Sequence, residues 1–82
     1  MTWNLEYTDT FGGEANYCWV RRARIESKPG ESQRGIMRRA KVILGLSGLR
    51  GRTVGYGDMF EFRPYGMATV LFVTWNDSEE EV

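Results

Sequence analysis

Arginine is the residue type in this sequence whose chemistry and spacing are most informative. Ten of the eleven basic residues lie between positions 21 and 52. A guanidinium group is planar and makes paired hydrogen bonds to phosphate or carboxylate, so a dense arginine block favours a polyanion or an acidic protein surface as its ligand. The candidate site within this block comprises Arg34, Arg38 and Lys41 at helical spacing, followed by Arg50 and Arg52.

The chain as a whole has no net charge, yet its charges are strongly segregated along the sequence. Residues 1–20 carry a net charge of −3, residues 21–52 carry +8, and residues 53–82 carry −5. The central block therefore creates a local positive potential that the overall charge conceals. The same residues could instead form an ordinary solvated face, and the sequence alone leaves that alternative open.

A second candidate surface depends on how the first two predicted strands pair across Gly12-Gly13. A two-residue turn pairs residues whose numbers add up to 25, which places Tyr17, Trp19 and Arg21 together on the face away from Tyr7. Two exposed rings beside an arginine would form a stacking platform for bases or a hot spot for a protein partner. A three-residue turn would instead place Trp19 opposite Tyr7 and gather the large rings on one core face. We favour the first register, and the alternative that Tyr17 and Trp19 pack under a loop or the tail stays open.

The residues that most enzymes and metal sites require are scarce. The chain has no histidine and one cysteine, so it lacks the imidazole used by Ser-His-Asp, Cys-His and most zinc, iron and copper sites. Cys18 lies within a predicted strand, where a buried structural thiol is the usual case. No spacing brings together any two of the scattered carboxylates Asp9, Glu14, Asp58 and Glu61. The sequence thus predicts a non-enzymatic protein with no cofactor and no bound metal.

Length and composition favour one small globular domain. The chain has 82 residues, of which 41% are hydrophobic and 27% charged, so it is too apolar for a disordered chain and too charged for a membrane protein. Its longest mostly apolar stretch, residues 67–75, is about half of the ~20 residues that a spanning helix needs, and no basic signal-peptide segment opens the chain. We expect a single domain over residues 1–75, a flexible acidic tail over residues 76–82, and a location in the reducing cytoplasm.

The hydrophobic pattern predicts the elements that must position these residues. Alternation predicts strands at about residues 2–8 and 15–25, a third within residues 53–63, and a central one at residues 67–75. Helical spacing of Ile36, Met37, Ala40, Ile43 and Leu44 predicts one amphipathic helix that begins after Ser32 and ends at Gly45 or Gly48. The order ββαββ indicates an α+β fold in which a four-stranded, mostly antiparallel sheet carries one helix on one face. The other face is then exposed or covered by a partner.

Two glycine motifs resemble ligand-binding loops. Gly55-Tyr56-Gly57 lacks the third glycine and the following helix of a dinucleotide-binding fingerprint, so we interpret it as the beginning of a strand. Gly48-Leu49-Arg50-Gly51 matches the GxxG loop with which KH domains clamp a nucleic-acid backbone, but a strand is expected to follow it. We interpret this segment as the loop that ends the helix.

A resemblance to short accessory proteins of bacterial phages, plasmids and integrated mobile elements lies in the run Tyr7 to Arg22, in Ala40-Lys41 and in the run Leu44 to Gly48. It extends over most of the chain up to Trp75 and brings no catalytic or binding residue with it. The resemblance implies an intracellular protein of a mobile element in a bacterium. Small proteins in that setting commonly act by binding and blocking a host complex or regulator, and anti-CRISPR proteins are similar in size and lifestyle.

We therefore expect a cytoplasmic protein of a bacterial or phage-infected cell that binds and modulates, by inhibition, a host protein or nucleoprotein complex. The alternative is a module that binds DNA or RNA directly through the basic helix and the loop after it. A homodimer formed through an exposed sheet edge or aromatic face also stays open, and no membrane partner is expected. The acidic residues between positions 77 and 81 weigh against simple nucleic-acid binding, because they would repel phosphate or cover the basic face.

Overall fold

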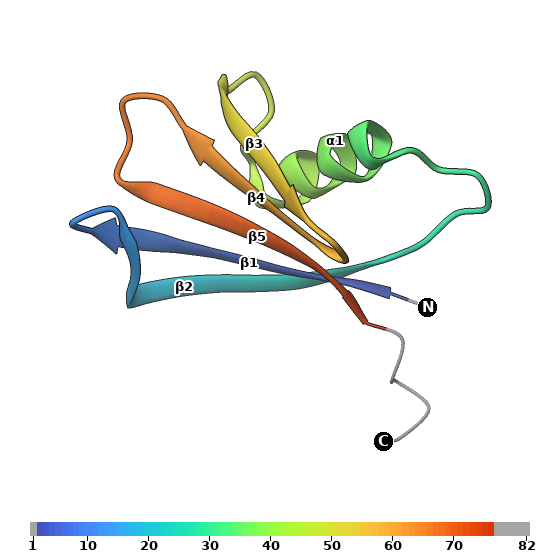
Figure 1. The fold of residues 1–82 in the computed structure, drawn as a ribbon, viewed down its shortest axis with the longest axis horizontal. Helices are drawn as coiled ribbons and strands as arrows, with labels where there is room; N and C mark the ends of the chain where they lie inside the picture. The colour runs from blue at the N-terminus through green and yellow to red at the C-terminus, as the bar shows by residue number, and fades with distance from the viewer. Residues whose placement is uncertain (1, 77–82) are drawn as a thin grey trace.

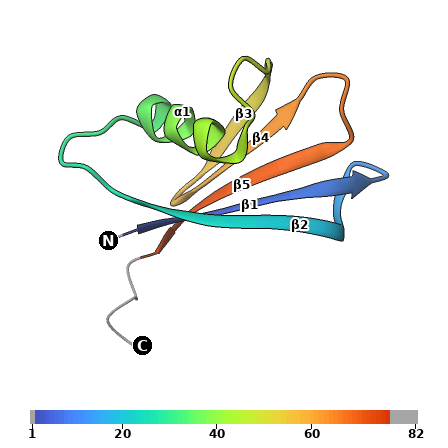
Figure 2. The same cartoon turned by 180° about the vertical axis from the view of Figure 1, so that it is seen from behind.

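The computed structural model describes residues 2–76, which form an antiparallel sheet with one helix across one of its faces (Figure 1, Figure 2). The sheet has five strands in the order β2-β1-β5-β4-β3. The elements in chain order are β1 (Thr2–Phe11), β2 (Glu14–Glu26), α1 (Gln33–Leu44), β3 (Gly51–Tyr56), β4 (Met59–Pro64) and β5 (Thr69–Asn76). The predicted α+β class with one helix on one sheet face is confirmed. Of the predicted tail, only Asn76 is described, and it ends β5.

The expectation of four strands is wrong by one strand. Residues 53–63 were expected to contain a single strand, but Tyr56 pairs with Met59 across a two-residue turn at Gly57-Asp58, so this region is a hairpin. Gly57 has a φ of 66°, a left-handed conformation that glycine adopts without steric cost. The element order is therefore ββαβββ.

The last strand, β5, lies in the centre of the sheet, as predicted. It pairs with β1, which is distant in sequence, on one side and with β4, the preceding strand, on the other. Val70, Leu71 and Val73 have no exposed surface, which explains the continuous apolar run in this segment.

Helix α1 begins and ends where its sequence predicts. The hydroxyl of Ser32 accepts a hydrogen bond from the Gly35 N–H at 3.1 Å, and Gly45 ends the helix with a φ of 74°. The helix buries Ile36, Met37, Ala40 and Leu44 against the sheet. Ile43, which was expected to face the core, is 47% exposed because it lies at the margin of this apolar stripe. No helix among residues 2–76 is long and apolar enough to cross a membrane.

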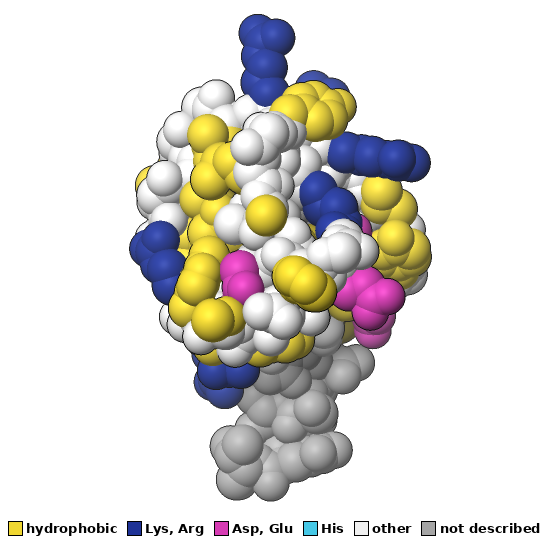
Figure 3. All heavy atoms as spheres, turned by 90° about the vertical axis from the view of Figure 1, so that its left-hand side faces the viewer, with side chains coloured by type: hydrophobic (Ala, Val, Ile, Leu, Met, Phe, Trp, Pro, Cys, Tyr) yellow, Lys and Arg dark blue, Asp and Glu magenta, His cyan; other side chains and the backbone are white. Residues whose placement is uncertain are grey.

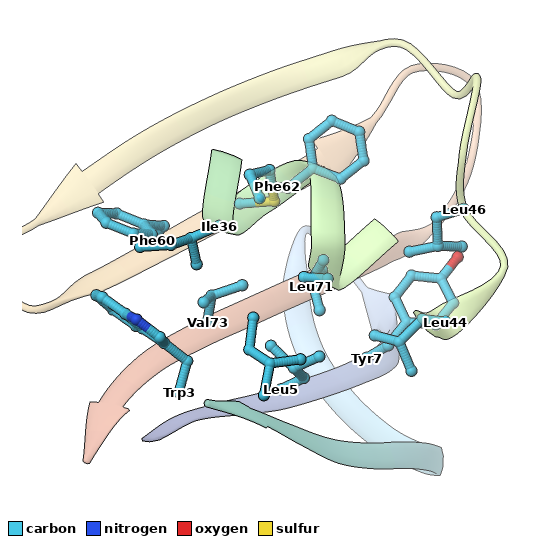
Figure 4. Packing of buried hydrophobic residues seen from close by; sticks show 13 residues of the cluster. Trp3, Leu5, Tyr7, Ile36, Leu44, Leu46, Phe60, Phe62, Leu71 and Val73 are labelled. Carbon is cyan, nitrogen blue, oxygen red and sulfur yellow. The ribbon is translucent and has the colours of Figure 1, made fainter. Parts of the chain in front are cut away.

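One hydrophobic cluster fills the space between the helix and the sheet (Figure 4). The Trp3 ring stacks on Phe60 with a centroid distance of 5.2 Å and meets Trp75 edge to face at 4.7 Å. Phe62 lies under the helix and is 1% exposed. Burial of these large rings supplies much of the driving force for a chain of this size.

The register between β1 and β2 differs from both of the registers considered from the sequence. At the turn the two-residue pairing holds, since Phe11 pairs with Glu14 and Thr10 pairs with Ala15. Beyond Asp9 the pairing shifts by three residues, so that Tyr7 lies opposite Arg21 rather than opposite Cys18 or Trp19. Four residues of β2, residues 16–19, lie opposite the single residue Asp9 and form a bulge that separates the two registers.

Two side chains of β1 hold this bulge in place. The Thr8 hydroxyl, which is fully buried, accepts a hydrogen bond from the Tyr17 N–H at 3.1 Å and donates one to the Trp19 carbonyl at 2.8 Å. The Asp9 carboxylate accepts hydrogen bonds from the Cys18 N–H at 2.8 Å and from the Asn16 amide at 2.9 Å. Tyr17 itself adopts a φ of 56°, which is unusual for a residue other than glycine. Side-chain acceptors therefore replace the sheet hydrogen bonds that the bulge removes.

The bulge should loosen in acid, because the hydrogen bonds from Asn16, Trp19 and Cys18 hold the pKa of Asp9 below its ordinary value of 3.8. Since folding lowers this pKa, the ionised carboxylate stabilises the folded state above the unfolded pKa, and that contribution is lost as the pH falls through the folded pKa. We expect the Cys18 and Trp19 amide resonances to shift together with a midpoint below pH 3.8 in an NMR titration. In Asp9→Asn both resonances should lose that titration. A midpoint at or above 3.8 would contradict this account of the bulge.

Candidate functional site

A groove between α1 and β3 brings together three of the four basic residues of the helix. It has a volume of about 580 Å³. Its walls are formed by Gln33, Arg34, Met37, Arg38 and Lys41 of α1, by Ser47 and Gly48 of the following loop, by Thr53 and Gly55 of β3, and by Phe60 of β4.

Small residues on β3 leave the space for this groove. The strand is at an edge of the sheet, and Gly51, Thr53 and Gly55 lie on its helix-facing side because their partners include the core residues Phe60 and Phe62. A Cβ atom on Gly55 would have the Phe60 ring as its only neighbour, at 3.7 Å and beyond. The helix therefore faces β3 across an open channel instead of packing side chains onto it.

The charge of the groove is entirely positive among its lining residues. Arg34 and Arg38 are exposed on its rim, and neither makes an ion pair with another described residue. Lys41 is partly buried, and its ammonium lies 3.9 Å from the centroid of the Phe62 ring, a cation–π contact that fixes its position at the base of the groove. The groove therefore presents a row of cations that form no ion pair with any carboxylate in the described part of the chain.

Three other basic residues, Arg22, Arg39 and Arg63, form ion pairs within the fold. Arg39 of the same helix pairs with Glu31 and also donates to the Glu26 carbonyl at 2.9 Å. Arg22 pairs with Glu6 at 3.0 Å. Arg63 pairs with Glu61 and donates to the Gly13 carbonyl at 2.7 Å, so it ties the β1–β2 turn to β4.

Arg50 and Arg52 do not join the three cations of the helix. Arg50 is exposed in the loop after α1, where its carbonyl accepts a hydrogen bond from the Tyr65 N–H at 2.9 Å. Arg52 projects from β3 on the sheet face opposite the helix, because it pairs with Arg63 and alternates with the groove residue Thr53. It lines a smaller cavity of about 230 Å³ there.

Tyr17 and Trp19 both lie in the bulge of β2, but their side chains contact different residues of β1. Tyr17 is 48% exposed and its hydroxyl donates to Glu6 at 2.8 Å, a hydrogen bond that raises the pKa of the phenol. Trp19 is 42% exposed, but its ring meets Tyr7 edge to face at 5.3 Å. Arg21 lies opposite Tyr7. The expectation that Tyr17, Trp19 and Arg21 share one face away from Tyr7 is therefore wrong, and the reason is the three-residue register shift.

The β2 aromatic residues and the α1–β3 groove also lie at opposite edges of the sheet. Four strand spacings separate the two edges, or about 19 Å. Figure 3 shows the end of the molecule with the β1–β2 and β4–β5 turns, where Lys and Arg side chains project at separate points between hydrophobic and acidic ones. The basic block of the sequence is thus dispersed over the surface, and the groove is the place where its charges converge.

Two of the carboxylates considered as candidate catalytic groups have structural roles, and the cysteine lies in the bulge. Asp9 supports the bulge, and Glu61 pairs with Arg63. Cys18 was expected to be buried, but it is exposed because it lies in the bulge and not in the regular ladder. Within residues 2–76 no three His, Cys, Asp or Glu side chains are grouped as they would be around a metal ion.

Sequence reasoning missed the part of the groove that lies outside the helix. The missed residues are Ser47, Thr53, Gly55 and Phe60, and Gln33 of the helix was missed as well. One signal was present, since Gly51, Thr53 and Gly55 alternate as small residues along one side of a strand. Comparison of the chain with protein-family models, curated proteins and solved structures gives no match.

Proposed function

We propose that this chain is a non-enzymatic accessory protein of a mobile genetic element that binds and inhibits a host protein or nucleoprotein complex in the bacterial cytoplasm. The observation that carries the proposal is the α1–β3 groove, which is lined by Arg34, Arg38 and Lys41 and by no carboxylate of residues 2–76. Unneutralised cations repel one another, so an anionic surface on a partner would relieve that repulsion on binding.

A binding role also agrees with how the other polar groups are used. The carboxylates Asp9 and Glu61 are engaged in hydrogen bonds or ion pairs that support the fold. The groove offers positive charge, hydroxyl groups and backbone, which are groups that hold a partner in place rather than transform it.

Site-specific photocrosslinking in bacterial cells tests the proposal. A photoreactive phenylalanine at Ser47, on the groove, should form adducts with a host component, whereas the same residue at Tyr56, which is exposed on the other sheet face, should form few. Arg34→Glu combined with Arg38→Glu should abolish the Ser47 adducts. Equal adducts from both positions, or none from Ser47, would overturn the proposal.

A further inference from the structure

We infer that the α1–β3 groove takes the phosphodiester backbone of a single nucleic-acid strand, independent of base sequence. This inference rests on the proposed function, because it names the component of the host complex that the groove contacts. Three properties of the groove support it, namely the spread of its charges, the depth of one cation and the absence of an exposed ring among its lining residues.

The cations are too far apart for one small anion. Arg34 and Lys41 are separated by seven residues of helix, which is about 10.5 Å along the helix axis, with Arg38 between them. A single phosphate contacts one end of such a row at a time. A chain that repeats its negative charge at regular intervals can contact all three cations at once.

The depth of the groove favours a single strand over a duplex. The exposed guanidinium groups of Arg34 and Arg38 are accessible from outside, whereas the Lys41 ammonium is partly buried over the Phe62 ring. A duplex is a wide, stiff cylinder that would contact the rim only. A single strand is narrow and flexible enough to enter the groove and reach the lysine.

Hydrogen-bond donors complete a site for phosphate and sugar oxygens. The hydroxyl-bearing residues Ser47 and Thr53 lie on the groove wall, and Gly48 and Gly55 expose backbone without a side chain in the way. Hydroxyl groups and backbone N–H groups are common donors to the nucleic-acid backbone, and contacts of this kind carry no sequence information.

The apolar part of the groove argues against an acidic protein segment as the ligand. Tight protein interfaces depend on a few large side chains that fill pockets. In this groove the large apolar residues are already buried, since Phe60 is 3% and Met37 6% exposed. The same burial removes any platform on which bases could stack, so affinity should come from phosphate contacts and should not depend on sequence.

Fluorescence anisotropy with labelled oligothymidine, oligouridine, a DNA duplex of equal length and polyglutamate tests the inference. We expect both single strands to bind more tightly than the duplex, and polyglutamate not to bind. With three phosphate contacts the slope of log K against log salt should be about −2, and Arg34→Glu with Arg38→Glu should bring its magnitude below about 1. The thymidine and uridine arms show whether DNA or RNA is preferred.

Two further variants separate the groove from general charge. Gly55→Val fills the groove without changing its charge and suits a strand, so binding should fall at least tenfold while the fold is retained by circular dichroism. Arg24→Glu is the matched control, because Arg24 is exposed on β2 and makes no ion pair with another described residue. Because residues 77–82 are acidic, each variant is compared in the full chain and in a chain that ends at Asn76.

Equal or tighter binding of the duplex, undiminished binding by Gly55→Val, or binding of polyglutamate alone would overturn the inference. Each result is distinct from failure of the proposed function. A protein adduct at Ser47 without strand binding would retain the host partner and reject the phosphate strand. Binding of the single-stranded oligonucleotides without any Ser47 adduct in cells would retain the phosphate strand as a ligand and reject the host partner.

Discussion

Phe62→Ala is expected to lower the free energy of unfolding by about 3–5 kcal/mol, the largest effect of any single side-chain truncation considered for this protein. Phe62 is 1% exposed under the helix, so its removal leaves a cavity that the sheet and helix cannot both collapse to fill. An 82-residue domain has a total stability of roughly 4–12 kcal/mol. Truncation at this one position should therefore remove at least about a quarter of the total stability.

Chemical denaturation followed by circular dichroism measures this loss. Phe11→Ala provides the matched control, because Phe11 is 80% exposed at the β1–β2 turn and its truncation should change stability by no more than about 0.5 kcal/mol. Equal effects of the two truncations would show that the core is not organised around Phe62.

Phe62→Leu separates the two roles of this ring. Leucine keeps most of the apolar contact and so should retain the fold, but it removes the aromatic face under Lys41. The lysine would then lose the contact that holds it at the base of the groove. In this variant the free energy of binding single-stranded nucleic acid should lose a larger fraction of its value than the free energy of unfolding does.

The elements that sequence predicted correctly are those whose signals are local. Helix α1 is determined by its periodic apolar residues, by the cap at Ser32 and by Gly45. The β1–β2 turn follows from Gly12-Gly13 and β5 from its apolar run. In each case the residues that specify the structure lie within a few positions of it.

The elements that were missed depend on contacts between distant residues. The bulge in β2 exists because the side chains of Thr8 and Asp9 accept backbone hydrogen bonds from residues nine or ten positions later. Nothing in the alternation of β2 marks this shift, and the two-residue turn beside it is correct. The Gly57-Asp58 turn was missed for a different reason, since the glycine before Tyr56 made the pair look like the beginning of one strand.

The candidate site divides in the same way. The cationic side of α1 is a property of helical spacing, so Arg34, Arg38 and Lys41 could be grouped from the sequence. The facing wall depends on strand order, which places β3 at one edge of the sheet and β2 at the other. Strand order is set by which strands pair across the whole sheet, and for this reason the aromatic residues of β2 could not be placed relative to the groove.

Gly51→Ala is expected to disrupt the β3 wall of the groove. A Cβ atom at this position would lie against the carbonyl oxygen of Arg63 and 2.7 Å from the Cα of Pro64. Both neighbours are backbone atoms of β4, so no side-chain rotation can relieve the overlap, and the two strands must separate at this point. We expect the free energy of unfolding to fall by about 3 kcal/mol, at the upper end of the cost of overpacking.

Gly55→Ala makes this prediction specific, because it adds the same methyl group to the same strand on the same side. There the new Cβ would lie 3.7 Å from the Phe60 ring, an ordinary van der Waals distance, so stability should be retained or slightly increased. Thermal unfolding of the two variants therefore compares steric overlap with β4 directly, since chain entropy and strand propensity change equally. Binding of single-stranded nucleic acid should weaken in Gly51→Ala and be retained in Gly55→Ala. The reason is that Gly51→Ala frees the end of β3 nearest the loop that carries Ser47 and Gly48, whereas Gly55→Ala leaves the β3 wall of the groove in place. Equal melting temperatures would mean that β3 and β4 do not approach each other at Gly51, and the groove would then lack the fixed wall on which the single-strand site depends.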